Sequence, residues 1–116
     1  MNAEILSLQE ALRAFARERE WEPFHSPKNL ASALSVEAGE LLEHFQWMTE
    51  QQSRALDGRK TEAVSEEAAD IFLYLLQLTD KLDIDLLAAA RRKLEINAAK
   101  YPVDLAKGSS KKYSEF

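Results

Sequence analysis

Two pairs of acidic residues in the middle of the chain repeat a spacing that could build a metal site. Glu37 precedes Glu40 by three positions, and Glu67 precedes Asp70 by the same interval. On a helix, residues three positions apart share one face and lie one turn apart. Glu37 and Glu67 also fall on the apolar stripes of their segments, so we expect both carboxylates to point inward.

Four inward carboxylates on two antiparallel helices would repel one another. Two of them about 5 Å apart at an effective dielectric near 20 repel by roughly 3 kcal/mol. A hard divalent cation would neutralise them, and Mg²⁺ usually shares its coordination with substrate phosphates. The alternative is that the acids are solvated, or that one pairs with Arg91 or Lys93. The predicted metal ligands are Glu37, Glu40, Glu67 and Asp70.

The same pattern suggests phosphoryl chemistry. Bound Mg²⁺ would neutralise phosphate charge and lower the pKa of a water that attacks phosphorus. A carboxylate that the metal does not fully use could accept the proton of this water, and Glu40 or Glu43 is the predicted base. Gly39 lies between the first two acids, where a glycine costs roughly 1 kcal/mol relative to alanine. It indicates either a close approach by a ligand or another backbone, or tight helix packing alone.

A polar face near the C-terminus could bind the substrate. Lys93, Asn97 and Lys100 lie at positions i, i+4 and i+7, next to Tyr101. The two lysines suit triphosphate oxygens, and Asn97 offers a donor and an acceptor to a sugar or base. The alternative is an ordinary solvated basic face. Further phosphate-binding candidates are Lys28, Lys111 and Lys112.

The two tryptophans could stack on a nucleobase. Trp21 and Trp47 each lie where a predicted helix meets a loop, and an aromatic face can stack on a base for roughly 1 to 3 kcal/mol. From the residues alone, a core or interface position is the alternative for both. His25 would then be a surface or capping residue, and His44 a structural one.

The elements that must position these residues are expected to be helices. Apolar residues recur every three to four positions, and Ser26 and Pro27 have the types expected at a helix start. Thr49 and Gln52 have capping-box spacing, which predicts a short helical turn. Asp83 or Asp85 can cap the last helix. The long helices are expected at residues 3–20, about 27–48, about 61–82, and from that cap to 101.

Composition indicates one all-α domain. Only 3 Gly and 3 Pro occur in 116 residues, too few for a turn-dense β-sandwich or barrel. We expect a helical domain over residues 1–102 and a polar C-terminal tail over 103–116. The stretch 71–76 is apolar on every side, which indicates a subunit interface and therefore a homo-oligomer.

Charge and apolar content exclude some classes of partner. A net charge of −5 disfavours binding to polymeric nucleic acid, and the absence of cysteine excludes disulfides and thiolate metal sites. The longest apolar run is far shorter than the roughly 20 residues of a membrane span. The start of the chain does not resemble a signal peptide, so we expect a cytoplasmic protein without a membrane partner.

The acidic pattern resembles a known family. Glu-x-x-Glu, then 26 residues, then Glu-x-x-Asp is similar to the metal motif of the all-α nucleoside triphosphate pyrophosphohydrolases of the MazG type, in particular the dCTP pyrophosphatase branch. The segments 21–30, 43–47, 97–103 and 108–113 are also similar to that branch, so the resemblance covers nearly the whole chain.

The resemblance implies a four-helix MazG-like bundle that forms homodimers or homotetramers. It implies Mg²⁺-dependent hydrolysis of dCTP, and of 5-modified dCTP, to the monophosphate and pyrophosphate, which sanitises the nucleotide pool. Lys93, Asn97 and Tyr74 match substrate-contacting positions of the family, and Trp21 and Trp47 match its base pocket, with His25 nearby. The predicted substrate-binding residues are Trp21, His25, Trp47, Tyr74, Lys93, Asn97, Lys100 and Tyr101.

One departure concerns the base pocket. Some members of the branch carry a histidine on the first helix, where this chain has Leu12, which puts the base preference in doubt. Two alternatives stay open: the same chemistry with broad specificity for dNTPs and NTPs, and a non-catalytic helical dimerisation module.

Overall fold

The computed structural model describes residues 2–115, and every regular element in them is a helix. This confirms the all-α class. The elements are α1 (Ala3–Glu18), η1 (Glu22–Phe24), α2 (Pro27–Glu43), α3 (Glu50–Ser53), α4 (Gly58–Lys81), α5 (Leu86–Lys100), α6 (Val103–Ala106) and η2 (Tyr113–Glu115).

Side-chain caps begin α2, α3 and α5 where the sequence predicts them. Ser26 accepts a hydrogen bond from the N–H of Asn29, with Pro27 as the first residue of α2. Asp85, rather than Asp83, caps α5 by accepting from the N–H of Ala88. The short helix α3 begins with the predicted capping box of Thr49 and Gln52. These interactions are local, which is why the sequence pattern could predict them.

Helix α2 is shorter than expected, and α4 is longer. Helix α2 ends at Glu43, and the N–H groups of His44, Phe45 and Met48 then bond to carbonyls three residues back. Phe45 and Met48 are half-buried in these turns. The apolar spacing therefore continues to Met48, although the helix does not. Helix α4 begins at Gly58 because Asp57 caps it.

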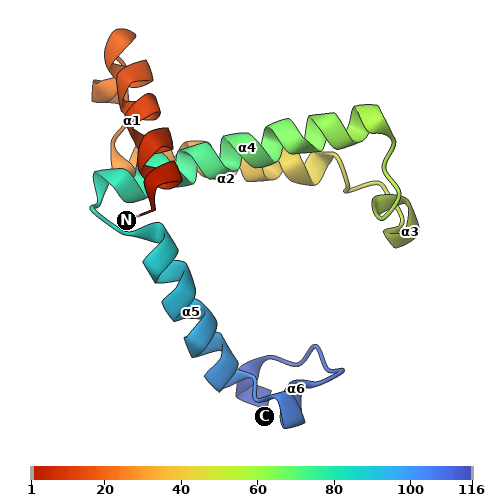
Figure 1. Ribbon diagram of the computed structural model, residues 1–116. Coiled ribbons are helices and arrows are strands. Elements are labelled where there is room, and N and C mark those ends of the chain that lie inside the picture. Colours follow the sequence, from red (N-terminus) through yellow and green to blue (C-terminus); the bar gives the residue numbers. More distant parts are fainter. Residues whose placement is uncertain (1, 116) are drawn as a thin grey trace. The chain divides into compact units, whose positions relative to one another are not determined.

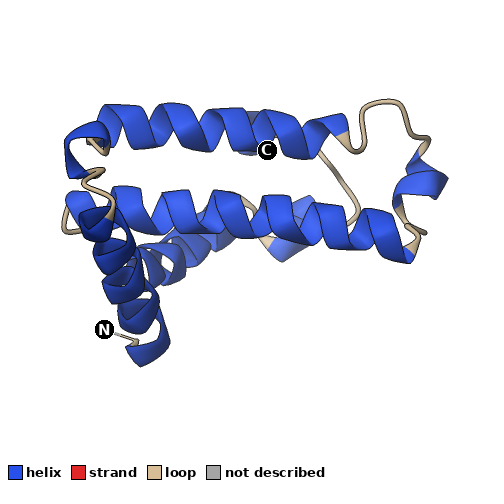
Figure 2. Cartoon of the chain, turned by 90° about the horizontal axis from the view of Figure 1, so that it is seen from above, coloured by secondary structure: helices blue, strands red, loops and turns tan. Residues whose placement is uncertain are grey.

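The chain divides into two compact units, one ending at Ile84 and one beginning at Asp85. In the first unit, α2 and α4 run antiparallel, side by side (Figures 1 and 2). Helix α1 packs against α4 and crosses the end of the pair where α2 begins, and α3 lies at the other end. Leu30 of α2 and Leu76 of α4 are fully buried.

Polar contacts also hold α1 on α4. Arg13 forms a two-pronged ion pair with Asp80, in which Nε donates to Oδ2 at 2.7 Å. Beside it, the buried Thr79 hydroxyl bonds to carbonyl oxygens of its own helix. At the far end of the pair, Nζ of Lys60 lies 3.3 Å from Nδ1 of half-buried His44, which gives His44 the structural place expected for it.

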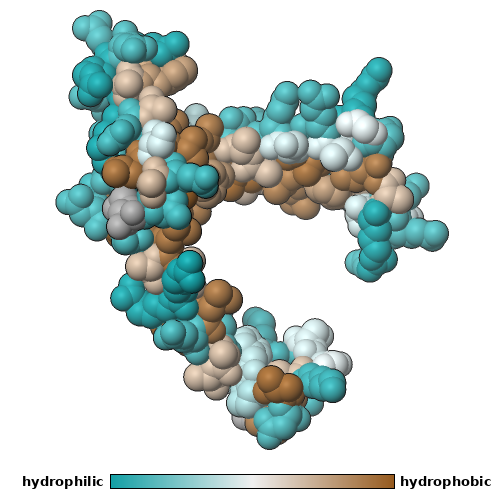
Figure 3. Space-filling model, viewed as in Figure 1, coloured by the Kyte–Doolittle hydropathy of each residue, from teal (hydrophilic) through white to brown (hydrophobic). Residues whose placement is uncertain are grey.

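Part of the first unit has a hydrophobic surface. Figure 3 shows apolar surface along the α2–α4 pair. Among the large apolar residues of these two helices, Val36, Leu42 and Phe72 are exposed. Phe72 belongs to the stretch that is apolar on every side.

No helix in the described part of the chain is long and apolar enough to cross a membrane.

The second unit contains α5 and the C-terminal segment. After Pro102 the chain forms α6 and η2, and the Tyr113 ring lies edge-on to Tyr101 with 6.3 Å between centroids. Nζ of Lys100 lies 4.6 Å from the centre of the Tyr113 ring. The segment after residue 102 therefore has helical turns and ring contacts of its own, and the domain boundary at 102 stays a prediction.

Candidate active site

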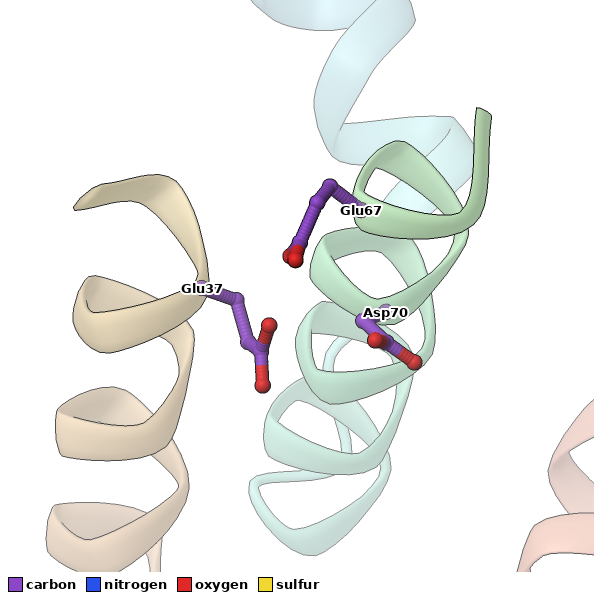
Figure 4. Close-up of side chains that lie close together, drawn as sticks. All are labelled: Glu37, Glu67 and Asp70. Atoms are coloured by element: carbon purple, nitrogen blue, oxygen red, sulfur yellow. The ribbon is translucent and has the colours of Figure 1, made fainter. Parts of the chain in front are cut away.

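Three of the predicted acids converge between α2 and α4. Glu37 projects from α2, and Glu67 and Asp70 project from successive turns of α4 (Figure 4). The carboxylates of Glu37 and Glu67 point toward one another, and one oxygen from each of the three acids lies within 4.8 Å of the others. Antiparallel packing of α2 and α4 thus brings together residues that are 30 or more positions apart.

The three acids have no positively charged partner among the described residues. Oε2 of Glu37 and Oε2 of Glu67 are buried and have no hydrogen-bond partner. Among the described residues, no ion pair includes Glu37, Glu67 or Asp70. The hydrogen bond that a protonated Glu37 can share with Glu67 raises the pKa of Glu37 from 4.5 to about 7, and burial and Glu40 act in the same direction.

The acidic cluster has the ligands that a metal ion requires. The donors are all carboxylate oxygens, two of them buried and unpartnered, and a hard divalent cation prefers such ligands. No ion pair within residues 2–115 supplies a cation to these groups. The cluster therefore fits a hard divalent cation by ligand type and by charge.

The two candidate bases lie further along α2. Glu40 is half-buried one turn after Glu37, close enough to act on the Glu37 pKa, but it is outside the group of three convergent oxygens. Glu43 is the last residue of α2 and is exposed. A Cβ added at Gly39 would meet no atom within 4 Å, so neither backbone nor side chain of the described chain packs closely there.

A cavity of about 340 Å³ opens beside the acids. Glu37 and Asp70 form part of its wall, and four rings form another part. The rings of Phe15 and Trp21 meet edge to face with 5.8 Å between centroids, and those of Trp21 and His25 with 6.2 Å. The aromatic side chains in the wall are Phe15, Trp21, His25 and Tyr74.

This cavity unites one group of predicted site residues and leaves out another. Trp21, His25 and Tyr74 line it together with two of the acids. Trp47 does not line it and is 88% exposed. The reason is the length of α2: Trp21 precedes this 17-residue helix and Trp47 follows it, so about 25 Å of helix separates them.

Phe15, Leu73 and Gln77 also line the cavity, although the sequence pattern did not predict them as site residues. Gln77 follows Asp70 by seven positions and Tyr74 by three, the spacing of residues on one helix face. That spacing was the available signal.

The remaining predicted residues lie in the second unit. Lys93, Asn97 and Lys100 lie on α5, and Tyr101 is the residue that ends it. Lys93 is exposed, whereas Asn97 and Lys100 are half-buried. Their part in substrate binding stays a prediction.

Comparison with known proteins defines the class. Residues 32–116 match the MazG-like family. dCTP pyrophosphatase 1 from Homo sapiens is 44% identical over 103 residues, and that from Bos taurus is 43% identical over the same length; each match covers 87% of this chain and 61% of the relative. The crystal structure of a pyrophosphatase from Archaeoglobus fulgidus is 40% identical with a TM-score of 0.81, and the match covers 88% of this chain and 95% of that one.

The chain belongs to the MazG-like family. It spans about three fifths of the length of the curated relatives that it matches.

Proposed function

We propose that this protein is a Mg²⁺-dependent nucleotide pyrophosphohydrolase. Its substrates are dCTP and 5-modified dCTP, which it hydrolyses to the monophosphate and pyrophosphate, and its role is sanitation of the nucleotide pool. The observation that carries the proposal is the cluster of Glu37, Glu67 and Asp70. Two of its oxygens are buried without a partner, and Glu37 and Asp70 also line an aromatic cavity. Similarity to proteins named dCTP pyrophosphatase 1 and to a structure titled a pyrophosphatase supports it.

Glu37, Glu40, Glu67 and Asp70 would hold the metal. Bound there, Mg²⁺ would neutralise phosphate charge and activate water for attack on phosphorus. Glu40, which lies outside the convergent group, or Glu43 would accept the proton of this water. Glu40 is better supported because it acts on the Glu37 pKa and so lies near the cluster.

The aromatic wall has a separate task. Trp21, Tyr74 and His25 would enclose the base and exclude water from the cavity, with Phe15 supporting Trp21 edge to face. Stacking on such rings is worth roughly 1 to 3 kcal/mol per base. On α5, Lys93 and Lys100 would bind triphosphate oxygens, and Asn97 and Tyr101 would contact the nucleoside.

We also propose that the chain assembles as a homodimer or homotetramer and works in the cytoplasm. The exposed Val36, Leu42 and Phe72 support assembly, because large exposed apolar patches mark interaction surfaces. The expected partners are the nucleotide and other copies of this chain.

The test is pyrophosphate release from the four dNTPs, dUTP and 5-methyl-dCTP, with and without Mg²⁺. The variant is Glu67→Gln, which keeps the shape of the side chain but removes its charge. Glu66→Gln is the matched control, because Glu66 is the exposed neighbour on the same helix. We expect fast Mg²⁺-dependent release from cytosine substrates, lost in Glu67→Gln and retained in Glu66→Gln.

Other results would favour the alternatives. Equal release from every nucleotide would keep the chemistry and withdraw the dCTP assignment. No release, together with a Glu67→Leu variant that is more stable than the wild type at every Mg²⁺ concentration, would indicate a helical dimerisation module.

A further inference from the structure

Gln77 lies in the cavity wall at a distance from the acids. It follows Asp70 by seven residues on α4, or about 10 Å along the helix axis. It also lines a smaller cavity of about 50 Å³, which shares Leu12, His25 and Gln77 with the larger one. Gln77 therefore lies where the two cavities meet.

The hydrogen bonding of Gln77 is half complete. Its Nε2 donates to the carbonyl oxygen of Leu73 at 3.4 Å, and no described residue donates to its Oε1. Unlike Oε2 of Glu37 and Oε2 of Glu67, this oxygen is not cut off from solvent, so it is open to a ligand in the cavity.

The distance between Gln77 and the acids is similar to the distance between the phosphates and the base of a nucleotide. With the phosphates at Glu37 and Asp70, a sugar and a pyrimidine ring extend along the aromatic wall. The far edge of the base then lies at Gln77. This placement rests on the function proposed above.

We propose that Gln77 is a specificity-determining residue, whose Oε1 accepts a hydrogen bond from the exocyclic amino group of cytosine. Uracil and thymine carry a carbonyl oxygen at that position. Two acceptors would then face each other, and neither would be satisfied. Sites that hydrogen-bond one substrate group reject analogues lacking it, because buried polar groups are left unpaired.

The hydrogen bond to Leu73 explains why the Gln77 amide can distinguish cytosine from uracil. A freely rotating carboxamide presents either its oxygen or its NH₂ and so suits cytosine and uracil alike. Because Nε2 is held by the Leu73 carbonyl, the oxygen is the end left for the base. The local helix geometry thus converts an ambiguous side chain into an acceptor.

The test compares dCTP with dUTP as substrates of the full chain with Mg²⁺. Gln77→Met keeps the length of the side chain and removes the acceptor, and Gln77→Glu keeps an acceptor oxygen. Gln51→Met makes the same change at an exposed position on α3. Thermal unfolding checks that each variant folds, and Gln77→Ala replaces Gln77→Met if that variant does not.

We expect the dCTP to dUTP ratio of kcat/KM to fall about tenfold in Gln77→Met, the value of roughly one hydrogen bond. Two changes contribute to the fall: dCTP loses its hydrogen bond, and dUTP no longer places its carbonyl oxygen against an unsatisfied acceptor. Gln77→Glu and Gln51→Met should keep the preference. A metal-free measurement, calorimetric binding of dCMP and dUMP in EDTA, should show the same change in ratio.

Three outcomes would overturn the inference. Turnover with the same ratio in Gln77→Met and the wild type removes the role of Gln77 but leaves the proposed function intact. A wild-type protein that prefers neither base, in turnover or in binding, would also remove the role of Gln77 and leave the proposed function intact. Absence of turnover with every nucleotide contradicts the proposed function, and this inference with it.

Discussion

Glu37 is a partly buried acid that lies beside other acids. It faces Glu67 across two helices, its Oε2 is buried without a partner, and these surroundings raise its pKa to about 7. Between the ordinary value of 4.5 and this raised value, the folded chain holds a proton that the unfolded chain has released. Stability must therefore fall as the pH rises through that window.

We predict that the metal-free protein loses thermal stability between pH 5 and pH 8, and that Glu37→Gln flattens this dependence. The variant should melt several degrees above the wild type at pH 8, where Glu37 is charged, and close to it at pH 5. Melting curves in EDTA across this range measure the effect.

Glu66→Gln is the control, because it removes an exposed charge from the same region and should keep the wild-type slope. Equal slopes in Glu37→Gln and the wild type would show that Glu37 does not lower stability in this way.

At the scale of the elements, one ion pair ties α1 to α4. Arg13 and Asp80 are 67 positions apart and join through two hydrogen bonds. The Arg13 guanidinium, through its hydrogen bond and its charge, holds the pKa of Asp80 below its usual value. A lowered carboxyl pKa contributes stability that is present above the unfolded value and is lost as the pH falls through the folded one.

We predict that Asp80→Asn lowers the melting temperature at pH 7, and that its difference from the wild type shrinks as the pH falls below the ordinary range of an aspartate carboxyl group. Helix α1 contributes Leu12 and Phe15 to the cavity, so KM for the nucleotide should rise as well. Glu62→Gln removes an exposed charge from α4 and should change neither property. A stability difference that does not shrink as the pH falls would exclude the ion pair as its cause.

Gly39 weakens α2 in its interior without a packing reason within the described chain. A Cβ there meets nothing within 4 Å, and glycine costs about 0.5 to 1 kcal/mol relative to alanine in a helix.

Gly39→Ala should therefore raise the free energy of unfolding by about that amount, measured by urea denaturation. If turnover falls while stability rises, a ligand or a second copy of the chain approaches Gly39. A loss of stability would show instead that the folded chain does pack against it.

At the scale of the whole molecule, the exposed apolar surface on α2 and α4 predicts assembly. We expect light scattering after size exclusion to give two or four times the chain mass. Phe72→Glu places a charge on this surface and should shift the protein to a smaller species.

Gln51→Glu, on exposed α3, should leave the assembly unchanged. A wild-type protein with the mass of one chain at micromolar concentration would contradict the prediction.

The sequence by itself determined the helices and the faces of the acid pairs. Caps such as Ser26 and Thr49, and the three-residue spacing of Glu67 and Asp70, act over a single turn of helix. Interactions of that range are encoded in neighbouring residues, so they can be read without a structure. The end of α2 was less well predicted, because apolar spacing continues through turns that bury residues without being helical.

Only the tertiary structure decided which distant groups meet. It brought Glu37 to Glu67, whereas it kept Trp47 away from the cavity that contains Trp21. It also made Gln77 part of the cavity wall. These outcomes depend on how α1, α2 and α4 cross and in which register they pack. Helical periodicity fixes the face on which a residue lies, but not which residue of another helix it faces.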